Sequence, residues 1–326
     1  MHAVRIRRSS IMNHSVSVLL LVVLAVAGPD ARADPFAYVP NEKSGTLTLI
    51  DVASDQVAGE IRAGTKPRGL VASKDGRTLY VSDQPNNALL IVDIAQRKTV
   101  GSIDLGESPE GVGISPDGVW VAVAVELSNS VTFVDARTNA KVFNVKTAGK
   151  NPEHAIFSPD GKWLYVSAEE ADTVDVVDVG QRRQVHSIKV GARPRGIAFT
   201  PDGKRAYVAC ELADTVYAID VASRQVLARI PAGVRVNGVT MHPSGRVVYV
   251  SNGGDGTVMA ISVPEDKVTA TIAVGKRPWN MAITPDGAKL YVANGRSNSV
   301  SVIDTKRASV LREIPVGELP WGVLVR

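Results

Sequence analysis

Residues 191–233 read GARPRGIAFTPDGKRAYVACELADTVYAIDVASRQVLARIPAG, and most of the chain after residue 37 repeats this pattern. Four short runs rich in Val, Ile, Tyr and Phe lie at residues 196–200, 206–210, 215–221 and 225–230. Turn-forming residues separate these runs, beginning with Pro201-Asp202-Gly203, so each run is predicted to be a β-strand. Four strands in a unit of this length are typical of one blade of a β-propeller.

The copies of this unit keep a nearly constant register. The first glycine recurs at Gly64, Gly106, Gly149, Gly191, Gly233, Gly275 and Gly317, in steps of 42 or 43 residues. An aromatic residue opens the second strand at Tyr38, Tyr80, Tyr165, Tyr207, Tyr249 and Tyr291, and Ala122 takes its place once. Such regularity predicts a ring of similar blades rather than a set of unrelated domains.

The two ends of the repeat region predict how the ring closes. The chain enters the pattern at Tyr38 with the second, third and fourth strands of a blade, and residues 320–325 form a first strand with no successor. Pairing that last strand with the first three completes a seventh blade and leaves no open sheet edge. The predicted fold is therefore all-β, a seven-bladed propeller of four-stranded antiparallel blades closed by the C-terminal strand.

Residues 1–33 lie outside the repeats and have the composition of a signal peptide. Arg5, Arg7 and Arg8 precede an apolar run at residues 16–27, and the small-residue site Ala31-Arg32-Ala33 follows. This run is shorter than the roughly 20 residues that span a bilayer. We expect cleavage after Ala33, a periplasmic location, no membrane span in the mature chain, and a single domain over residues 34–326. Both general secretory and twin-arginine export remain open.

Net charge and cysteine content limit the function classes. The formal net charge is +4, and the leader holds four arginines and one aspartate, so it carries most of that charge. A mature chain so near neutrality lacks the broad positive field of many nucleic-acid-binding proteins, although a local patch is compatible with it. Cys210 is the single cysteine, which excludes an internal disulfide and a thiolate metal cluster.

Chain direction predicts which loops share a face of the propeller. The Gly-x-x-Pro loops before the first strands should lie beside the loops that join second and third strands, and the Pro-Asp-Gly turns should lie on the opposite face, where they act as turn formers. The candidate ligand-binding residues on the first face are Arg68, Glu110, Glu153, His154, Arg193, Arg195, Arg235, Asn237, Arg277, Trp279 and Trp321.

These residues predict a polarised channel mouth. Glutamates 110, 126, 153 and 169 fall on one side of the ring, and the arginines continue round to Trp279 and Trp321. Arginine beside tryptophan suits a flat anion, because guanidinium binds carboxylates bidentately and indole stacks on rings. The competing interpretation is a rim of solvated charges with both tryptophans plugging the channel. His154 has no His or Cys partners in sequence, so no metal site is predicted.

The strand motifs resemble those of a known family. Tyr38-Val39-Pro40-Asn41, Tyr249-Val250-Ser251-Asn252 and Tyr291-Val292-Ala293-Asn294, with their Pro-Asp-Gly partners, resemble the YVTN-repeat (YncE-like) β-propellers over residues 37–326. Within that family the chain is most similar to exported propellers associated with pyrroloquinoline quinone (PQQ)-dependent catabolism. Ala122, Ala168 and Cys210 depart from the motif.

The resemblance implies a non-catalytic periplasmic accessory or binding protein, since hydrolase and phosphate-loop motifs are missing from the sequence. Its partner would be a quinoprotein dehydrogenase or a cytochrome, and PQQ, a planar tricarboxylate, would suit the mouth. We expect a monomer with no bound cofactor. One alternative is a propeller that binds single-stranded DNA, with bases stacked on Trp279 and Trp321. A third is an enzyme, either a lactonase with a carboxylate-rich metal centre or a haem-binding propeller with His ligands.

Overall fold

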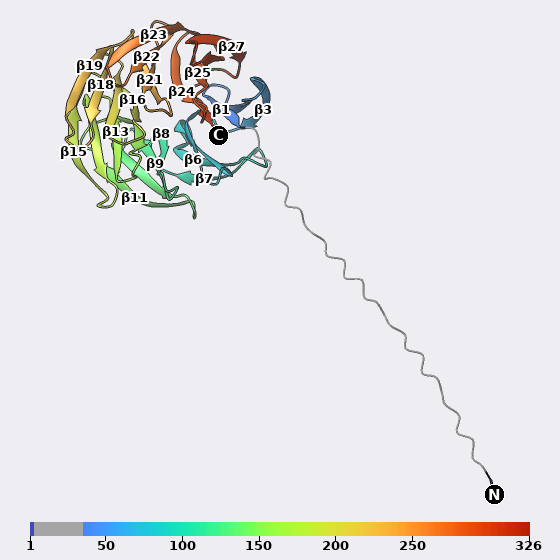
Figure 1. The fold of residues 1–326 in the computed structure, drawn as a ribbon. Helices are drawn as coiled ribbons and strands as arrows, with labels where there is room; N and C mark the ends of the chain where they lie inside the picture. Colours follow the sequence, from blue (N-terminus) through green and yellow to red (C-terminus); the bar gives the residue numbers. More distant parts are fainter. Residues whose placement is uncertain (3–34) are drawn as a thin grey trace. The chain divides into compact units, whose positions relative to one another are not determined.

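Seven four-stranded antiparallel sheets form a closed ring in the computed structural model, which describes residues 1, 2 and 35–326 (Figure 1). The predicted fold class, blade count and strand order are confirmed. The predicted signal peptide and its cleavage site after Ala33 lie outside the described residues. Among the described residues, no helix is long and apolar enough to cross a membrane.

The strands of each blade run outward from the ring axis in the order of the sequence repeat. The blade that joins both ends of the chain contains β28 (Leu324–Val325), β1 (Phe36–Asn41), β2 (Thr46–Asp51) and β3 (Gln56–Arg62). The next three blades are β4 (Pro67–Ala72), β5 (Thr78–Asp83), β6 (Ala88–Asp93) and β7 (Lys98–Asp104); β8 (Pro109–Ile114), β9 (Trp120–Val125), β10 (Ser130–Asp135) and β11 (Ala140–Lys146); and β12 (Pro152–Phe157), β13 (Trp163–Ala168), β14 (Thr173–Asp178) and β15 (Arg183–Lys189).

The last three blades follow the same plan. They are β16 (Pro194–Phe199), β17 (Arg205–Cys210), β18 (Thr215–Asp220) and β19 (Val226–Pro231); β20 (Val236–Met241), β21 (Val247–Asn252), β22 (Thr257–Ser262) and β23 (Lys267–Ala273); and β24 (Pro278–Ile283), β25 (Lys289–Asn294), β26 (Ser299–Asp304) and β27 (Ser309–Pro315). A short 3-10 helix, η1 (Gln84–Asn86), follows β5.

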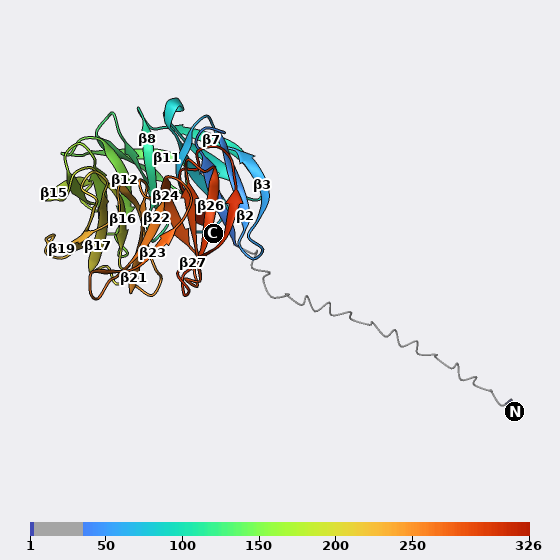
Figure 2. The same cartoon turned by 90° about the horizontal axis from the view of Figure 1, so that it is seen from above.

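The C-terminal strand closes the ring as predicted. β28 pairs with β1 through Ala37 opposite Val325 and Tyr38 opposite Leu324. The backbone N–H of Phe36 donates to the carbonyl of Arg326 at 2.7 Å. The backbone N–H of Trp321 donates to the carbonyl of Pro40 at 2.9 Å. Figure 2 shows the blue first strands and the red last strands in one part of the ring. The first and last strands of the chain therefore lie in one sheet, and the inner edge of β1 is paired.

Three of the recurring tyrosines, Tyr80, Tyr207 and Tyr291, hydrogen-bond to the next blade. Tyr207 on β17 is buried, and its hydroxyl donates at 2.8 Å to Asp266, which lies in the β22–β23 turn of the following blade. The hydroxyl of Tyr80 likewise donates at 2.8 Å to the carbonyl of Ala136 in the next blade. Each such hydrogen bond is worth about 1 kcal/mol, in addition to the burial of the ring. These three tyrosines therefore stabilise the contact between adjacent blades.

Glycines let the innermost strands approach the axis closely. A Cβ atom on Gly238 would lie 2.4 Å from the carbonyl oxygen of Trp279 on the next inner strand, and one on Gly69 would lie 2.5 Å from that of Glu110. Both contacts are with backbone, which cannot move aside cheaply. Two larger residues, His154 and Asn280, occupy this column and extend toward the axis.

Candidate functional site

The channel mouth is built from two sets of loops on one face of the ring. The loop ahead of each first strand is hydrogen-bonded to the loop after the second strand, as in the N–H of Glu211 to the carbonyl of Arg193 at 2.8 Å. Arg193 has a left-handed backbone, with φ of 59°, and its N–H donates to Asp172 of the preceding blade at 3.2 Å. Asx side chains therefore hold these loops across blade boundaries.

The mouth encloses a cavity of about 250 Å³. Its lining consists mainly of charged and amide side chains with two indoles: Glu42, Arg68, Gln84, Glu126, Glu153, Glu169, Arg193, Arg195, Asn237, Arg277, Trp279, Asn280 and Trp321. Of the candidate residues, eight line this cavity: Arg68, Glu153, Arg193, Arg195, Asn237, Arg277, Trp279 and Trp321. Glu110 lies behind Arg68, His154 lines a deeper cavity, and Arg235 is half-exposed near Glu211.

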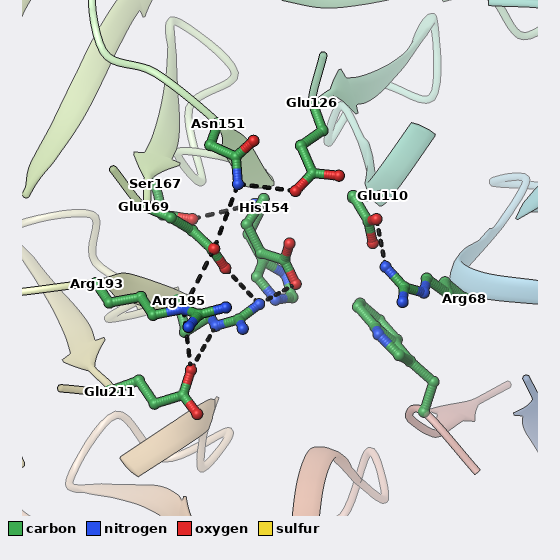
Figure 3. A network of polar contacts seen from close by, with 12 residues as sticks. Arg68, Glu110, Glu126, Asn151, His154, Ser167, Glu169, Arg193, Arg195 and Glu211 are labelled. Carbon is green, nitrogen blue, oxygen red and sulfur yellow. Dashed lines mark hydrogen bonds and ion pairs between the residues drawn. The ribbon is translucent and has the colours of Figure 1, made fainter. Parts of the chain in front are cut away.

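Arg195 is the centre of a buried ion cluster (Figure 3). Its Nη1 lies 2.6 Å from Glu153 Oε1 and also contacts Glu169, and its Nε donates to Glu211 at 3.0 Å. The Arg195 side chain is only 13% exposed. Burial alone would lower the pKa of Arg195, but the three carboxylates outweigh it and raise that pKa, so the guanidinium stays charged.

A second cluster surrounds Arg68. Its guanidinium contacts Glu110 through Nη1 and lies 3.3 Å from Glu42. Glu110 is fully buried and also accepts a hydrogen bond from Gln84 Nε2 at 2.9 Å. The Arg68 guanidinium thus lies between the carboxylates of Glu42 and Glu110, of which Glu110 is fully buried.

The tryptophan side of the mouth holds the remaining arginine pairs. Arg277 Nη2 donates to Glu211 at 2.9 Å, and the Arg277 guanidinium lies 5.8 Å from the Trp279 ring centroid, within cation–π distance. Arg193 Nε lies 3.3 Å from Glu169 and 3.4 Å from Glu211. Within the described residues, the terminal nitrogens of Arg193 donate no hydrogen bond, and its side chain is 39% exposed.

The carboxylates of the mouth differ in proton affinity. Burial, reinforced by the charge of Glu153, raises the pKa of Glu169 to about 7 and that of Glu110 to about 8. Burial would raise the pKa of Glu153 as well, but the attraction of Arg195 dominates together with the other nearby cations, and that pKa is lowered. Environments that separate the pKa values of neighbouring acids are typical of acid–base sites.

The structure corrects the predicted charge layout of the mouth. Arginines and glutamates were expected on opposite sides, either as a free anion receptor or as a solvated rim. Instead, Arg195 reaches the carboxylates of the preceding blade, so the charges interleave as buried ion pairs. An anionic ligand would have to compete with these carboxylates. Trp321 is 8% exposed and stacks on His154.

Sequence reasoning recognised only part of the position directly after each second strand: it placed Glu126 and Glu169 at the mouth but missed Glu42, Gln84 and Glu211. This position is occupied by Glu42, Gln84, Glu126, Glu169, Glu211, Gly253 and Gly295 around the ring. The two glycines leave room for the side chains of Arg277 and Trp279. A Cβ on Gly253 would lie 3.2 Å from Arg277 Cδ, and a Cβ on Gly295 would lie 3.0 Å from the Trp279 ring. Aligning this column of the repeat would have identified the acidic half of the site.

The mouth does not fit a carboxylate-rich metal centre. Its carboxylates are engaged by arginines, and in the described part of the chain no group of three or more His, Cys, Asp or Glu side chains is arranged to hold a metal ion. An arginine at the centre of the carboxylate cluster occupies the position that a cation would need.

The sequence matches the family described as "Lactonase, 7-bladed beta-propeller" over residues 34–142 and 180–314. These two ranges cover well over half of the chain. The chain belongs to this family. A search of curated proteins gives no match.

Solved structures with the same fold come from several functional settings. Hydrazine synthase of Kuenenia stuttgartiensis is 26% identical with a TM-score of 0.76, over 82% of this chain and 92% of that one. A functionally unknown protein from Desulfotomaculum acetoxidans is 16% identical with a TM-score of 0.78, over 89% and 98% of the two chains. The dihydro-haem d1 dehydrogenase NirN is 15% identical with a TM-score of 0.69, over 89% and 74%.

Family membership corrects the expected function class. The prediction of a non-catalytic protein is wrong, because the family to which the chain belongs is named for a hydrolytic activity. Local sequence motifs did not indicate this, because the residues of a propeller mouth come from different blades and form no contiguous signature.

Proposed function

We propose that this propeller is a hydrolase that opens small lactones at the channel mouth, with Glu169 as general base. The observation that carries the proposal is the position of Glu169: a carboxyl group with a pKa of about 7 that lines the cavity between Arg193 and Arg195. A base is most effective when its pKa lies near the working pH. Membership in the lactonase propeller family supplies the reaction class.

The reaction balances with residues of the mouth alone. Ionised Glu169 takes a proton from a water molecule, whose oxygen attacks the lactone carbonyl carbon to give a tetrahedral oxyanion. The ring carbon–oxygen bond then breaks, and Glu169 returns its proton to the leaving alkoxide, which yields a hydroxy acid. The product carboxyl group then ionises to solvent.

Arg193 is the group best placed to stabilise the oxyanion. Its terminal nitrogens donate no hydrogen bond within the described residues, whereas its Nε remains near Glu169 and Glu211. A preorganised guanidinium aimed at developing negative charge contributes a large share of the rate enhancement in acyl transfer. Arg195, in contrast, holds Glu153 and Glu169 in place and is a positioning residue.

The test is to measure the hydrolysis of γ-butyrolactone and of δ-valerolactone by pH-stat titration. Glu169→Gln should lower kcat by a factor of about 10²–10⁴, the usual contribution of a general base. Glu318→Gln is the matched control, because Glu318 is an exposed glutamate paired with Lys43 outside the cavity. The proposal fails if the wild-type protein hydrolyses neither lactone above background, or if Glu169→Gln keeps full activity.

The pH profile gives a separate readout. Glu169 acts as a base only when ionised, so kcat/KM should rise with pH through an apparent pKa of about 7 and then level off. The rise should disappear in any residual activity of Glu169→Gln. Arg193→Gln should lower the plateau and move the rise to higher pH, because the charge of Arg193 acts to lower the pKa of Glu169.

The ligands implied by the sequence resemblance remain predictions for the same mouth. PQQ would place its carboxylates near Arg193 and Arg277 and stack on Trp279, and single-stranded DNA would stack bases there. Tryptophan fluorescence titration with PQQ and with oligo-dT tests both. A steep loss of oligo-dT affinity with salt would indicate nucleic acid, whereas a PQQ response alone would connect the protein to a quinoprotein system.

A further inference from the structure

Glu126 differs from the other glutamates of the mouth in having no cationic partner. Four glutamates line the mouth cavity, and three of them form ion pairs with arginine or lysine: Glu42, Glu153 and Glu169. Across the described part of the chain, no Arg, Lys or His side chain pairs with Glu126. Its side chain is only partly buried. The negative charge of Glu126 therefore faces the cavity without a counter-ion.

Two neutral donors fix the orientation of Glu126. Ser108 Oγ donates to Glu126 Oε2 at 2.6 Å, and Asn151 Nδ2 donates to Glu126 Oε1 at 2.7 Å (Figure 3). Ser108 Oγ itself accepts a hydrogen bond from Gln84 Nε2 at 2.9 Å, so its single hydrogen points to Glu126. Each carboxylate oxygen can accept a second hydrogen bond. Glu126 is thus held in place without being neutralised.

Glu126 lies close to the proposed general base. Asn151 Nδ2, which donates to Glu126 Oε1 at 2.7 Å, also lies 3.5 Å from Glu169 Oε2. Because both distances meet at one nitrogen, the two carboxylate oxygens are no more than about 6 Å apart. A lactone whose carbonyl carbon is attacked by a water molecule on Glu169 therefore has its adjacent ring carbon within reach of Glu126.

The charge of Glu126 also acts on Glu169. Burial and the charge of Glu153 raise the pKa of Glu169, Arg195 and Arg193 lower it, and Glu126 adds a further rise. A cation bound to Glu126 would offset this last contribution and favour the ionised base. A positively charged group at this position would therefore be attracted to the mouth and would also support proton abstraction.

We propose that Glu126 binds an ammonium group of the substrate, so that the preferred substrates are lactones with an amino group on the carbon next to the carbonyl. An ammonium group carries three N–H donors and can use the free acceptor positions of Glu126. The arginines nearest to it leave Glu126 available, because Arg68 and Arg195 are paired with other carboxylates. This inference rests on the proposed hydrolase function and names the substrate class of the same site.

The experiment compares α-amino-γ-butyrolactone with α-methyl-γ-butyrolactone, which have the same ring and substituents of similar size but different charge. Binding to the wild-type protein is measured by calorimetry and by the shift in Tm, at about pH 6, where the amine is largely protonated. The amino lactone should bind about tenfold more tightly, the size of one hydrogen bond to a charged group. Affinity is the readout, because an ammonium group also activates the neighbouring carbonyl chemically.

Glu126→Gln is the test variant. It keeps the length of the side chain but removes the charge, so the preference for the amino lactone should fall to about twofold or less. Glu107→Gln is the matched control, because Glu107 is an exposed glutamate on the neighbouring loop, outside the cavity lining, and its backbone carbonyl accepts a hydrogen bond from the N–H of Leu127 at 3.4 Å. The control removes the same charge from the rim and should keep the preference.

Three results would overturn the inference. The first is wild-type protein that binds the methyl lactone as tightly as the amino lactone, a comparison that does not depend on any variant folding. The second is a full preference retained by Glu126→Gln. The third is an equal loss of preference in Glu107→Gln, which would assign the effect to the general charge of the rim rather than to contact with Glu126.

This inference and the hydrolase function can fail separately. Equal affinity for both lactones, with turnover of both, would overturn the role of Glu126 and leave the hydrolase function standing. Preferential binding of the amino lactone that Glu126→Gln removes, without turnover of either compound, would instead overturn the hydrolase function and support Glu126 as an ammonium-binding group.

Discussion

Replacing Arg195 with glutamine tests whether the mouth is held together by its buried ion cluster. The guanidinium is 13% exposed and contacts Glu153, Glu169 and Glu211. Removing one partner of a buried ion pair leaves uncompensated charge and costs about 3–5 kcal/mol. A loss of that size corresponds to a fall in Tm on the order of 10 °C in a protein this large.

The loss should depend on pH, and its sign follows from the carboxylates. Arg195 acts to lower the pKa of each of its three partners, so its removal raises their pKa values in the folded state. A group with a raised folded-state pKa supports stability fully at low pH and loses that support as pH rises through the new value. Arg195→Gln should therefore be mildly destabilising at about pH 5 and strongly destabilising at about pH 8.

Urea denaturation of the wild type and variant at both pH values provides the measurement. Arg205→Gln is the matched control. Arg205 pairs with Asp266 at 3.2 Å outside the mouth, and its side chain is 33% exposed. This substitution should lower the free energy of unfolding by about 1 kcal/mol or less. Equal destabilisation by Arg195→Gln at both pH values, or a loss no larger than that of the control, would refute the argument.

Three further predictions concern the ring. Deleting residues 320–326 should lower Tm far more than trimming an exposed tail, because it removes the partner strand of β1; an unchanged Tm would contradict closure. Gly238→Ala should destabilise by about 1–3 kcal/mol, since its Cβ would meet backbone at 2.4 Å, whereas Gly322→Ala meets only side-chain atoms from 3.1 Å and should be mild. Burial raises the pKa of Cys210 to about 12, so Ellman's reagent should label it only after denaturation; rapid labelling of the native protein would show an accessible thiolate.

The repeat made the fold predictable from sequence. A spacing of 42 or 43 residues, a tyrosine in each second strand and an unpaired strand at residues 320–325 were enough to predict seven blades and their closure. The same alignment predicted that the residue after each loop proline would face the channel mouth, as Arg68, Glu153 and Arg195 do. These features are local or periodic, so they can be read along the chain.

The chemistry of the mouth was not accessible in that way. Glu169 has a pKa near 7 only because blade packing buries it beside Glu153, and Arg195 is a structural cation rather than a free anion receptor because its side chain reaches back to the preceding blade. Partners separated by a whole repeat meet only when adjacent blades pack against each other.

The sequence by itself determined the blade count, the strand order and the set of residues on the mouth face, since each depends on a pattern repeated along the chain. The tertiary structure alone decided which charges pair and which carboxyl groups have a raised pKa because they are buried. The stacking of His154 on Trp321 across the axis is the clearest case, because no local rule relates residues three blades apart. Side-chain reach and burial fix these properties, and both depend on the complete ring.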